Sequence, residues 1–175
     1  MVFFDKNFME IFTYEIMSLI GGLIAGIALA AYTNKLLLIP GMLMALPGFL
    51  EMRGNISGSL ASRLSSGLFL GVLKERMVNG NVTASVILAV IGSFALGIFT
   101  FLFNYLVFGI VFTNIIFIFI IAGIIANLIE IPLTVLSTFY LFSKGHDPNN
   151  ILGPILTSTG DISSIISLLI AVVII

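Results

Sequence analysis

Residues 151–175 read ILGPILTSTGDISSIISLLIAVVII, in which one carboxylate, Asp161, lies among apolar, small and hydroxyl-bearing side chains. A transmembrane helix needs about 20 predominantly apolar residues, and this segment is long and apolar enough to be one. A charged group at bilayer depth is costly, so it usually faces a bundle interior or a water-filled path. The segment therefore predicts a membrane-spanning helix with a functional polar face.

The rest of the chain has the same apolar character. Of its 175 residues, 59% are hydrophobic and 9% are charged, whereas a soluble domain averages about 25% charged residues. We therefore predict an all-α integral membrane protein with the lipid bilayer as its surroundings. The net charge of -1 argues against nucleic acid as a partner, which needs a basic surface. The absence of cysteine excludes disulfides and thiolate metal sites.

We expect five transmembrane helices in a single transmembrane domain that covers residues 1–175. The expected spans are about 16–32, 36–73, 84–105, 110–142 and 151–175, with a loop at 74–81 and a turn at 143–150. The mixture of acids and phenylalanines in residues 1–15 indicates a short interfacial helix and not a cleavable signal.

Prolines are expected to interrupt or bend two of these spans. The second contains Pro40 and Pro47, with Gly48 and Gly54, and a broken helix is expected there because proline removes a backbone donor. The fourth span is long for one perpendicular crossing, so we expect it to tilt or to bend at Pro132.

The cationic residues predict the orientation. Lys74, Arg76 and Lys144 fall in loops on one side of the membrane, whereas only Lys35 falls on the other. Because cytoplasmic loops carry the excess of Lys and Arg, we place the N-terminus in the cytoplasm and the C-terminus outside the cell membrane.

The last segment carries a candidate cation site. Thr157, Asp161 and Ser164 are spaced four and three apart and share one helix face, and Gly153 and Ser167 continue the row. A carboxylate among hydroxyls suits a hard cation, and Mg²⁺ is usually bound through one or two carboxylates while it keeps its waters. Asp161 could instead cap a helix or pair with Arg53 or Arg63.

The second segment repeats the pattern around Asn55. Ser59, Ser62 and Ser66 follow at helical spacing, and Asn55 can either position a hydrated ion or bind a neighbouring helix. Arg53 and Arg63 cannot ligate a cation. We expect them to pair with Glu51 or Glu130, or to reach lipid headgroups.

Glu130 lies in the middle of the fourth span, between Asn127 and Thr134. A buried carboxylate needs a partner or a proton, so Glu130 is either a member of an ion pair or a second ion or proton site. The only histidine, His146, is expected to be a solvated loop residue and not a metal ligand.

Two runs of residues, in this order, carry a family resemblance. They are Pro47, Gly54-Asn55-Ile56-Ser57-Gly58 and Arg63 in the second span, and Asp147-Pro148, Gly153-Pro154 and Thr157-Ser158-Thr159-Gly160-Asp161 in the last. At these residues the chain resembles the transmembrane domain of the MgtE-type magnesium transporters, in its short stand-alone form without a soluble regulatory domain. It departs from the bacterial pattern at Ser59, where a glutamine is usual.

The resemblance implies a homodimer with one pore between the subunits, lined by the second and fifth spans. It further implies that Asp161 faces the pore and engages hydrated Mg²⁺, that Gly54, Asn55 and Gly58 belong to the pore motif, and that Thr157 lies one turn before the acid. A dimer also supplies two central carboxylates where one chain supplies one.

The function that we expect is divalent cation transport, with Mg²⁺ as the transported ion in a channel or transporter and with no organic cofactor. One alternative is a proton- or sodium-coupled exchanger, and another is a non-transporting accessory subunit. We do not expect an enzyme, because intramembrane proteases need two catalytic acids, clustered zinc ligands or a base beside a serine.

Overall fold

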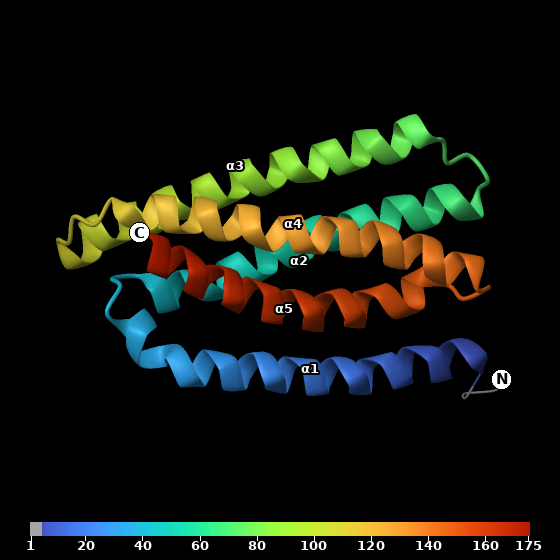
Figure 1. Ribbon diagram of the computed structural model, residues 1–175, viewed down its shortest axis with the longest axis horizontal. Helices are drawn as coiled ribbons and strands as arrows, with labels where there is room; N and C mark the ends of the chain where they lie inside the picture. Colours follow the sequence, from blue (N-terminus) through green and yellow to red (C-terminus); the bar gives the residue numbers. More distant parts are fainter. Residues whose placement is uncertain (1–4) are drawn as a thin grey trace.

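The computed structural model describes residues 5–175 and shows five α-helices that run alternately up and down one bundle (Figure 1). The helices are α1 (Lys6–Leu37), α2 (Met42–Phe69), α3 (Glu75–Phe108), α4 (Asn114–Ser143) and α5 (Pro148–Ile174). The described residues contain no β-strand. The predicted all-α class is therefore confirmed.

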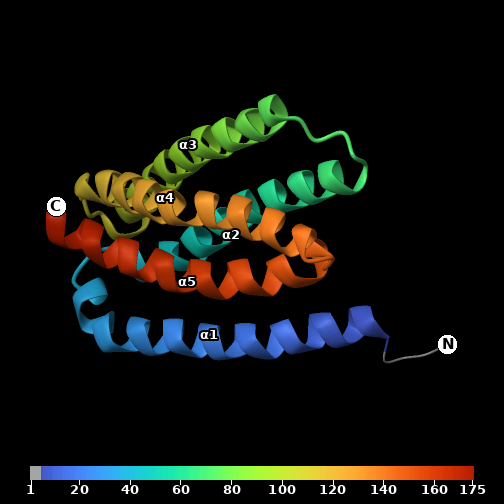
Figure 2. The ribbon, with the colours of Figure 1, turned by 45° about the vertical axis from the view of Figure 1, so that its right-hand side comes forward.

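The helices are arranged around α4 and α5. In both views α5 lies between α1 and α4, and α2 crosses behind them (Figures 1 and 2). Contacts join α2 to α3, α4 and α5, whereas α1 packs mainly on α5. The largest apolar cluster includes Phe49 of α2 and Phe119 of α4, with ring centroids 5.8 Å apart. Side chains from α2, α4 and α5 thus form the centre of the molecule.

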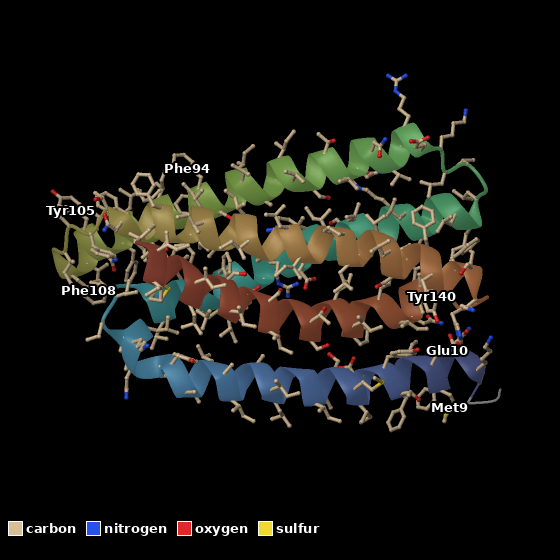
Figure 3. The ribbon with its side chains drawn as sticks, in the orientation of Figure 1. Met9, Glu10, Phe94, Tyr105, Phe108 and Tyr140 are labelled. Atoms are coloured by element: carbon tan, nitrogen blue, oxygen red, sulfur yellow. The ribbon has the colours of Figure 1, made fainter. Side chains whose placement is uncertain are left out.

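The outside of the bundle is apolar. Large hydrophobic side chains are exposed along α1, α3, α4 and α5, and Figure 3 shows Phe94, Tyr105 and Phe108 at the outer surface of α3. Four helices are long and apolar enough to cross a membrane, namely α1, α3, α4 and α5. These four helices indicate a multi-pass membrane protein. The remaining helix, α2, is more polar because it carries Glu51, Arg53 and Asn55.

The N-terminal boundary differs from the prediction. The helix expected in residues 1–15 to lead into the first span begins at Lys6 and is continuous with that span as α1, and residues 1–4 lie outside the described part of the chain. The Asp5 carboxylate accepts a hydrogen bond from the Phe8 backbone N–H at 2.8 Å and so caps α1. No proline or glycine follows until Gly21, so nothing in the sequence breaks the helix.

The predicted start of the second span at residue 36 is also wrong. Residues 36 and 37 end α1, a short link follows, and α2 begins at Met42. Gly41 makes the turn with a φ of 76°, which glycine adopts without steric cost. Pro47 does not break α2, which is continuous. It lies in the second turn, where the missing N–H costs the helix one hydrogen bond.

The remaining helix ends shift by several residues. The loop expected at 74–81 is helical from Glu75 onward, and an acid in the first turn favours a helix start there. The fourth helix begins at Asn114 and not at residue 110, after a turn in which Gly109 has a φ of 65°. The fifth begins at Pro148, a residue type suited to the first helical position, and Asp147 caps it by accepting from the Asn149 N–H at 2.9 Å.

Candidate functional site

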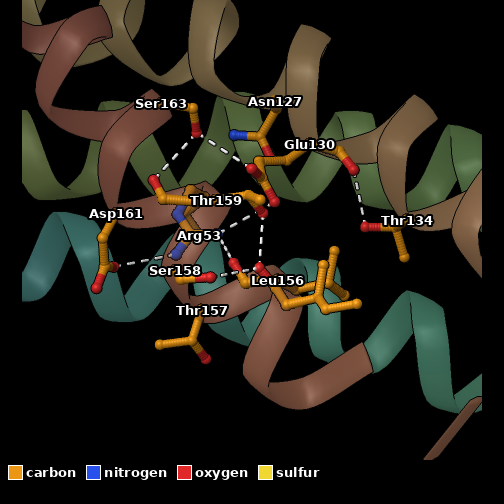
Figure 4. A network of polar contacts seen from close by, with 12 residues as sticks. Arg53, Asn127, Glu130, Thr134, Leu156, Thr157, Ser158, Thr159, Asp161 and Ser163 are labelled. Atoms are coloured by element: carbon orange, nitrogen blue, oxygen red, sulfur yellow. Dashed lines mark hydrogen bonds and ion pairs between the residues drawn. The ribbon is translucent and has the colours of Figure 1, made fainter. Parts of the chain in front are cut away.

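A buried arginine joins three helices at the centre of the bundle (Figure 4). Arg53 of α2 donates from Nη1 to Glu130 Oε2 of α4 at 3.3 Å and to the Leu156 carbonyl of α5 at 3.2 Å. Its Nη2 donates to Asp161 Oδ1 of α5 at 3.4 Å. The side chains of Arg53 and Glu130 are 1% and 0% exposed, whereas that of Asp161 is 27% exposed. Asp161 is therefore the open end of a charged row, Glu130–Arg53–Asp161.

The row contains two ion pairs that the sequence left open as alternatives. Glu130 forms an ion pair with Arg53, which is one of the two roles that the sequence predicted for it. Ser163 Oγ adds a hydrogen bond to Glu130 Oε1 at 3.2 Å, and Thr134 Oγ1 donates to the Glu130 backbone carbonyl at 2.7 Å. The pairing of Asp161 with Arg53 is also confirmed. The capping alternative is wrong, because Asp161 lies in the interior of α5.

Gly160 makes room for the guanidinium. A Cβ atom at this position would overlap Nη1, Cζ and Nη2 of Arg53, so the arginine packs directly on the backbone of α5. The sequence prediction did not assign a role to Gly160 or to the Leu156 carbonyl. The signal that could have found Gly160 is a glycine in a helix immediately before the only acid of the segment, because glycine inside a helix is costly without a packing reason.

A groove of about 220 Å³ lies between α2 and α5 on the outside of the bundle, lined by small, polar and apolar residues. Gly54 and Gly58 contribute its α2 wall, and Gly153 and Thr157 contribute its α5 wall. Thr157 is exposed and donates from Oγ1 to the Gly153 carbonyl at 2.9 Å. Asp161 follows Thr157 by one helical turn on the same face. The structure therefore brings four of the predicted polar-face residues together beside Asp161.

Asn55 lies in a different place from the other predicted site residues. It lines a groove of about 370 Å³ between α2 and α3, together with Ser59 and Arg63. There Arg63 Nη1 donates to Asn81 Oδ1 at 3.4 Å. Neither Glu51 nor Glu130 is within ion-pair distance of Arg63 in residues 5–175, so of the alternatives expected for Arg63 the contact with lipid headgroups stays a prediction. The motif Gly54-Asn55 thus faces two grooves at once.

Ser164 is fully buried, although helical spacing places it on the same face of α5 as Thr157 and Asp161. Its hydroxyl has no hydrogen-bond partner within the described residues. Ser167 is buried as well and donates to the Ser163 carbonyl at 2.6 Å. The row predicted from Gly153 to Ser167 is therefore exposed only as far as Asp161, because neighbouring helices cover the later members of the row.

His146 is not simply a solvated loop residue, as the sequence suggested. Its Nδ1 lies 2.9 Å from Glu10 Oε1, and its side chain is 40% exposed. Figure 3 shows Glu10 pointing from α1 toward the bundle and Met9 pointing away from it. The pair ties the start of α1 to the turn before α5.

A family model described as MgtE, divalent cation transporter, matches residues 46–171, from the first turns of α2 to the end of α5. The chain belongs to the MgtE family. The resemblance drawn from the two polar runs is confirmed, and an MgtE-family chain is a transporter and not an enzyme. No curated protein and no solved structure matched it. The match contains the whole of the charged row and the groove between α2 and α5, so these features lie in the transport domain of this MgtE chain.

Proposed function

We propose that this MgtE-family protein carries Mg²⁺ across the cell membrane through a pore between two copies of the chain. The observation that supports this most is the groove between α2 and α5, lined by Gly54, Gly58, Gly153 and Thr157. It opens on the outside of a bundle whose other exposed side chains are largely apolar. Asp161 lies one turn further along α5 and is partly exposed.

Such a face is costly in lipid, because hydrocarbon offers no hydrogen bonds to polar groups. A second copy related by a two-fold axis would cover it with an identical face and enclose a polar path. Two grooves would then meet, and two Asp161 carboxylates would oppose each other across the path. Together their charge matches that of one divalent cation.

The donor chemistry fits a hydrated ion. Mg²⁺ prefers oxygen ligands, gives up its waters reluctantly and is usually held through one or two carboxylates. The exposed Thr157 hydroxyl and Asn149, both on the groove, can bond the retained waters. Gly54 and Gly58 have open space where a Cβ would lie, which leaves width for an ion with its water shell. Two predicted site residues do not line this groove. Asn55 lines the groove between α2 and α3, and Ser164 is buried.

The bundle also supports five crossings by one transmembrane domain. α1 begins at the end of the bundle opposite to that at which α5 ends, and α2 runs between the same two ends (Figures 1 and 2). The α2–α3 turn, next to Lys74 and Arg76, and the α4–α5 turn with Lys144 lie at one end (Figure 1). We therefore propose a cytoplasmic N-terminus and an outside C-terminus.

Mg²⁺ uptake into liposomes that contain the purified protein tests this function. Asp161→Asn keeps the shape of the side chain and removes its charge, and it should abolish most of the uptake. Glu75→Gln is the matched control, because Glu75 is an exposed acid at the start of α3, and it should retain uptake. Equal uptake by wild type and Asp161→Asn would refute the proposed path. Uptake that requires a proton or sodium gradient would replace the channel by a coupled exchanger.

A further inference from the structure

The charged row Glu130–Arg53–Asp161 contains two ion pairs that share one guanidinium. We propose that Arg53 competes with the transported cation for Asp161, and that Glu130 weakens this competition by holding the same guanidinium. This inference rests on the proposed function, since it takes Asp161 as the carboxylate that the ion meets. Arg53 and Glu130 are then positioning residues that set the affinity of a site they do not themselves form.

The geometry shows a guanidinium shared between two acids. Nη1 lies 3.3 Å from Glu130 Oε2, and Nη2 lies 3.4 Å from Asp161 Oδ1. Both distances exceed the roughly 2.7–2.9 Å of a strong charge-assisted hydrogen bond, so neither acid holds the arginine at its optimum. A small displacement of the guanidinium would shorten one pair and lengthen the other.

The surroundings restrict this displacement to the line between the two acids. Gly160 closes one face, since even a methyl group there would overlap the guanidinium, and the Leu156 carbonyl accepts from Nη1 at 3.2 Å. Arg53 is 1% exposed and cannot swing out to solvent. Its Nε has no hydrogen-bond partner in the described residues, so the terminal nitrogens alone fix its position.

Exposure decides which acid an ion can reach. Glu130 is fully buried, whereas the Asp161 side chain is 27% exposed. A hydrated cation can therefore approach Asp161 and not Glu130. When the cation binds Asp161, repulsion between like charges favours a guanidinium closer to Glu130.

The charges explain why both buried residues are needed. Glu130, Arg53 and Asp161 together carry a net charge of -1, so two chains present -2 to a divalent cation. Without Glu130, the arginine would cancel Asp161 and the path would carry no net charge. Without Arg53, Glu130 would be a buried carboxylate with no counter-charge, which is strongly unfavourable.

The experiment compares the Mg²⁺ concentration for half-maximal uptake in three proteins that fold and elute as wild type does. They are wild type, Glu130→Gln and the double variant Arg53→Gln/Glu130→Gln, each measured alone and with Asp161→Asn. In Glu130→Gln, the arginine pairs with Asp161 alone. The Mg²⁺ concentration for half-maximal uptake should then rise by about tenfold, the order expected for one positive charge that Glu130 no longer neutralises and that acts over a few ångströms. The double variant removes the competitor, loses no net charge and should lower it below the wild-type value.

Shifts in opposite directions are the signature of competition, because a purely structural role of the pair would weaken uptake in both variants. Half-maximal concentrations that are the same in all three proteins, or that rise in both variants, would overturn the inference. If Glu130→Gln does not fold, the double variant decides alone, and an unchanged or raised value refutes the proposal. Uptake that does not depend on Asp161 would instead refute the proposed function, so the two failures are distinguishable.

Discussion

Gly160→Ala is predicted to destabilise the bundle, although alanine is a better helix former than glycine. The added Cβ would overlap three atoms of the Arg53 guanidinium, which is held by Glu130, Asp161 and the Leu156 carbonyl. A hydrogen bond to a charged group contributes about 1.5–3 kcal/mol, and breaking a buried ion pair costs about 3–5 kcal/mol. The helix gains back about 1 kcal/mol from the alanine. We expect a net loss of about 2–4 kcal/mol.

Gly153→Ala is the matched control. Gly153 lies in the same helix, and a Cβ there meets nothing within 4 Å, so this substitution should be neutral or stabilising by up to about 1 kcal/mol. Reversible unfolding of both variants in detergent micelles, followed by circular dichroism against denaturant, measures the difference. Gly160→Ala should also cost little in the background Arg53→Gln/Glu130→Gln, where the guanidinium is absent. Equal stability of the two alanine variants would refute the packing that we describe.

Three further predictions concern a helix cap and two contacts between segments of the chain. Asp5→Ala should cost about 1 kcal/mol, because it removes the cap on the Phe8 N–H, and hydrogen exchange at the start of α1 should accelerate. Gly97→Ala should destabilise the α3–α4 contact, since its Cβ would lie 2.8 Å from the Ile116 Cα, and a melting temperature equal to wild type would contradict this. His146→Ala removes one partner of Glu10, the one in the turn before α5, so a protease should cleave the N-terminal part of α1 faster than in wild type, while unfolding of the rest of the bundle changes little.

Much of the fold could be predicted from the sequence, because composition alone separates a membrane protein from a soluble one. The apolar runs gave the number of helices, and the polar loops gave their order. Helix ends were less predictable, as at Glu75, and so was the effect of Pro47, which lies inside a continuous α2. There local signals compete, since a charged or proline-containing stretch is compatible with either a loop or a helix terminus.

The site could be predicted only in part. Asp161 and Thr157 could be singled out because one acid in an apolar helix is conspicuous, and helical spacing predicts that they share a face. Spacing could not show that Ser164 is buried, because that depends on how the neighbouring helices pack against α5. The pairing of Arg53 with both acids joins residues 77 and 108 positions apart, and only the tertiary arrangement selects it from the possible partners.

The central claim is that the face of α2 and α5 around Thr157 lines a water-filled ion path. The protein contains no cysteine, so a single introduced cysteine is a specific probe. Thr157→Cys and Ile166→Cys are nine residues apart and on opposite faces of α5, and both side chains are exposed. In liposomes, a charged thiol reagent should modify Thr157→Cys and block Mg²⁺ uptake, and it should leave Ile166→Cys unmodified in lipid. Equal reactivity at the two positions, or no reaction at Thr157→Cys, would contradict the account.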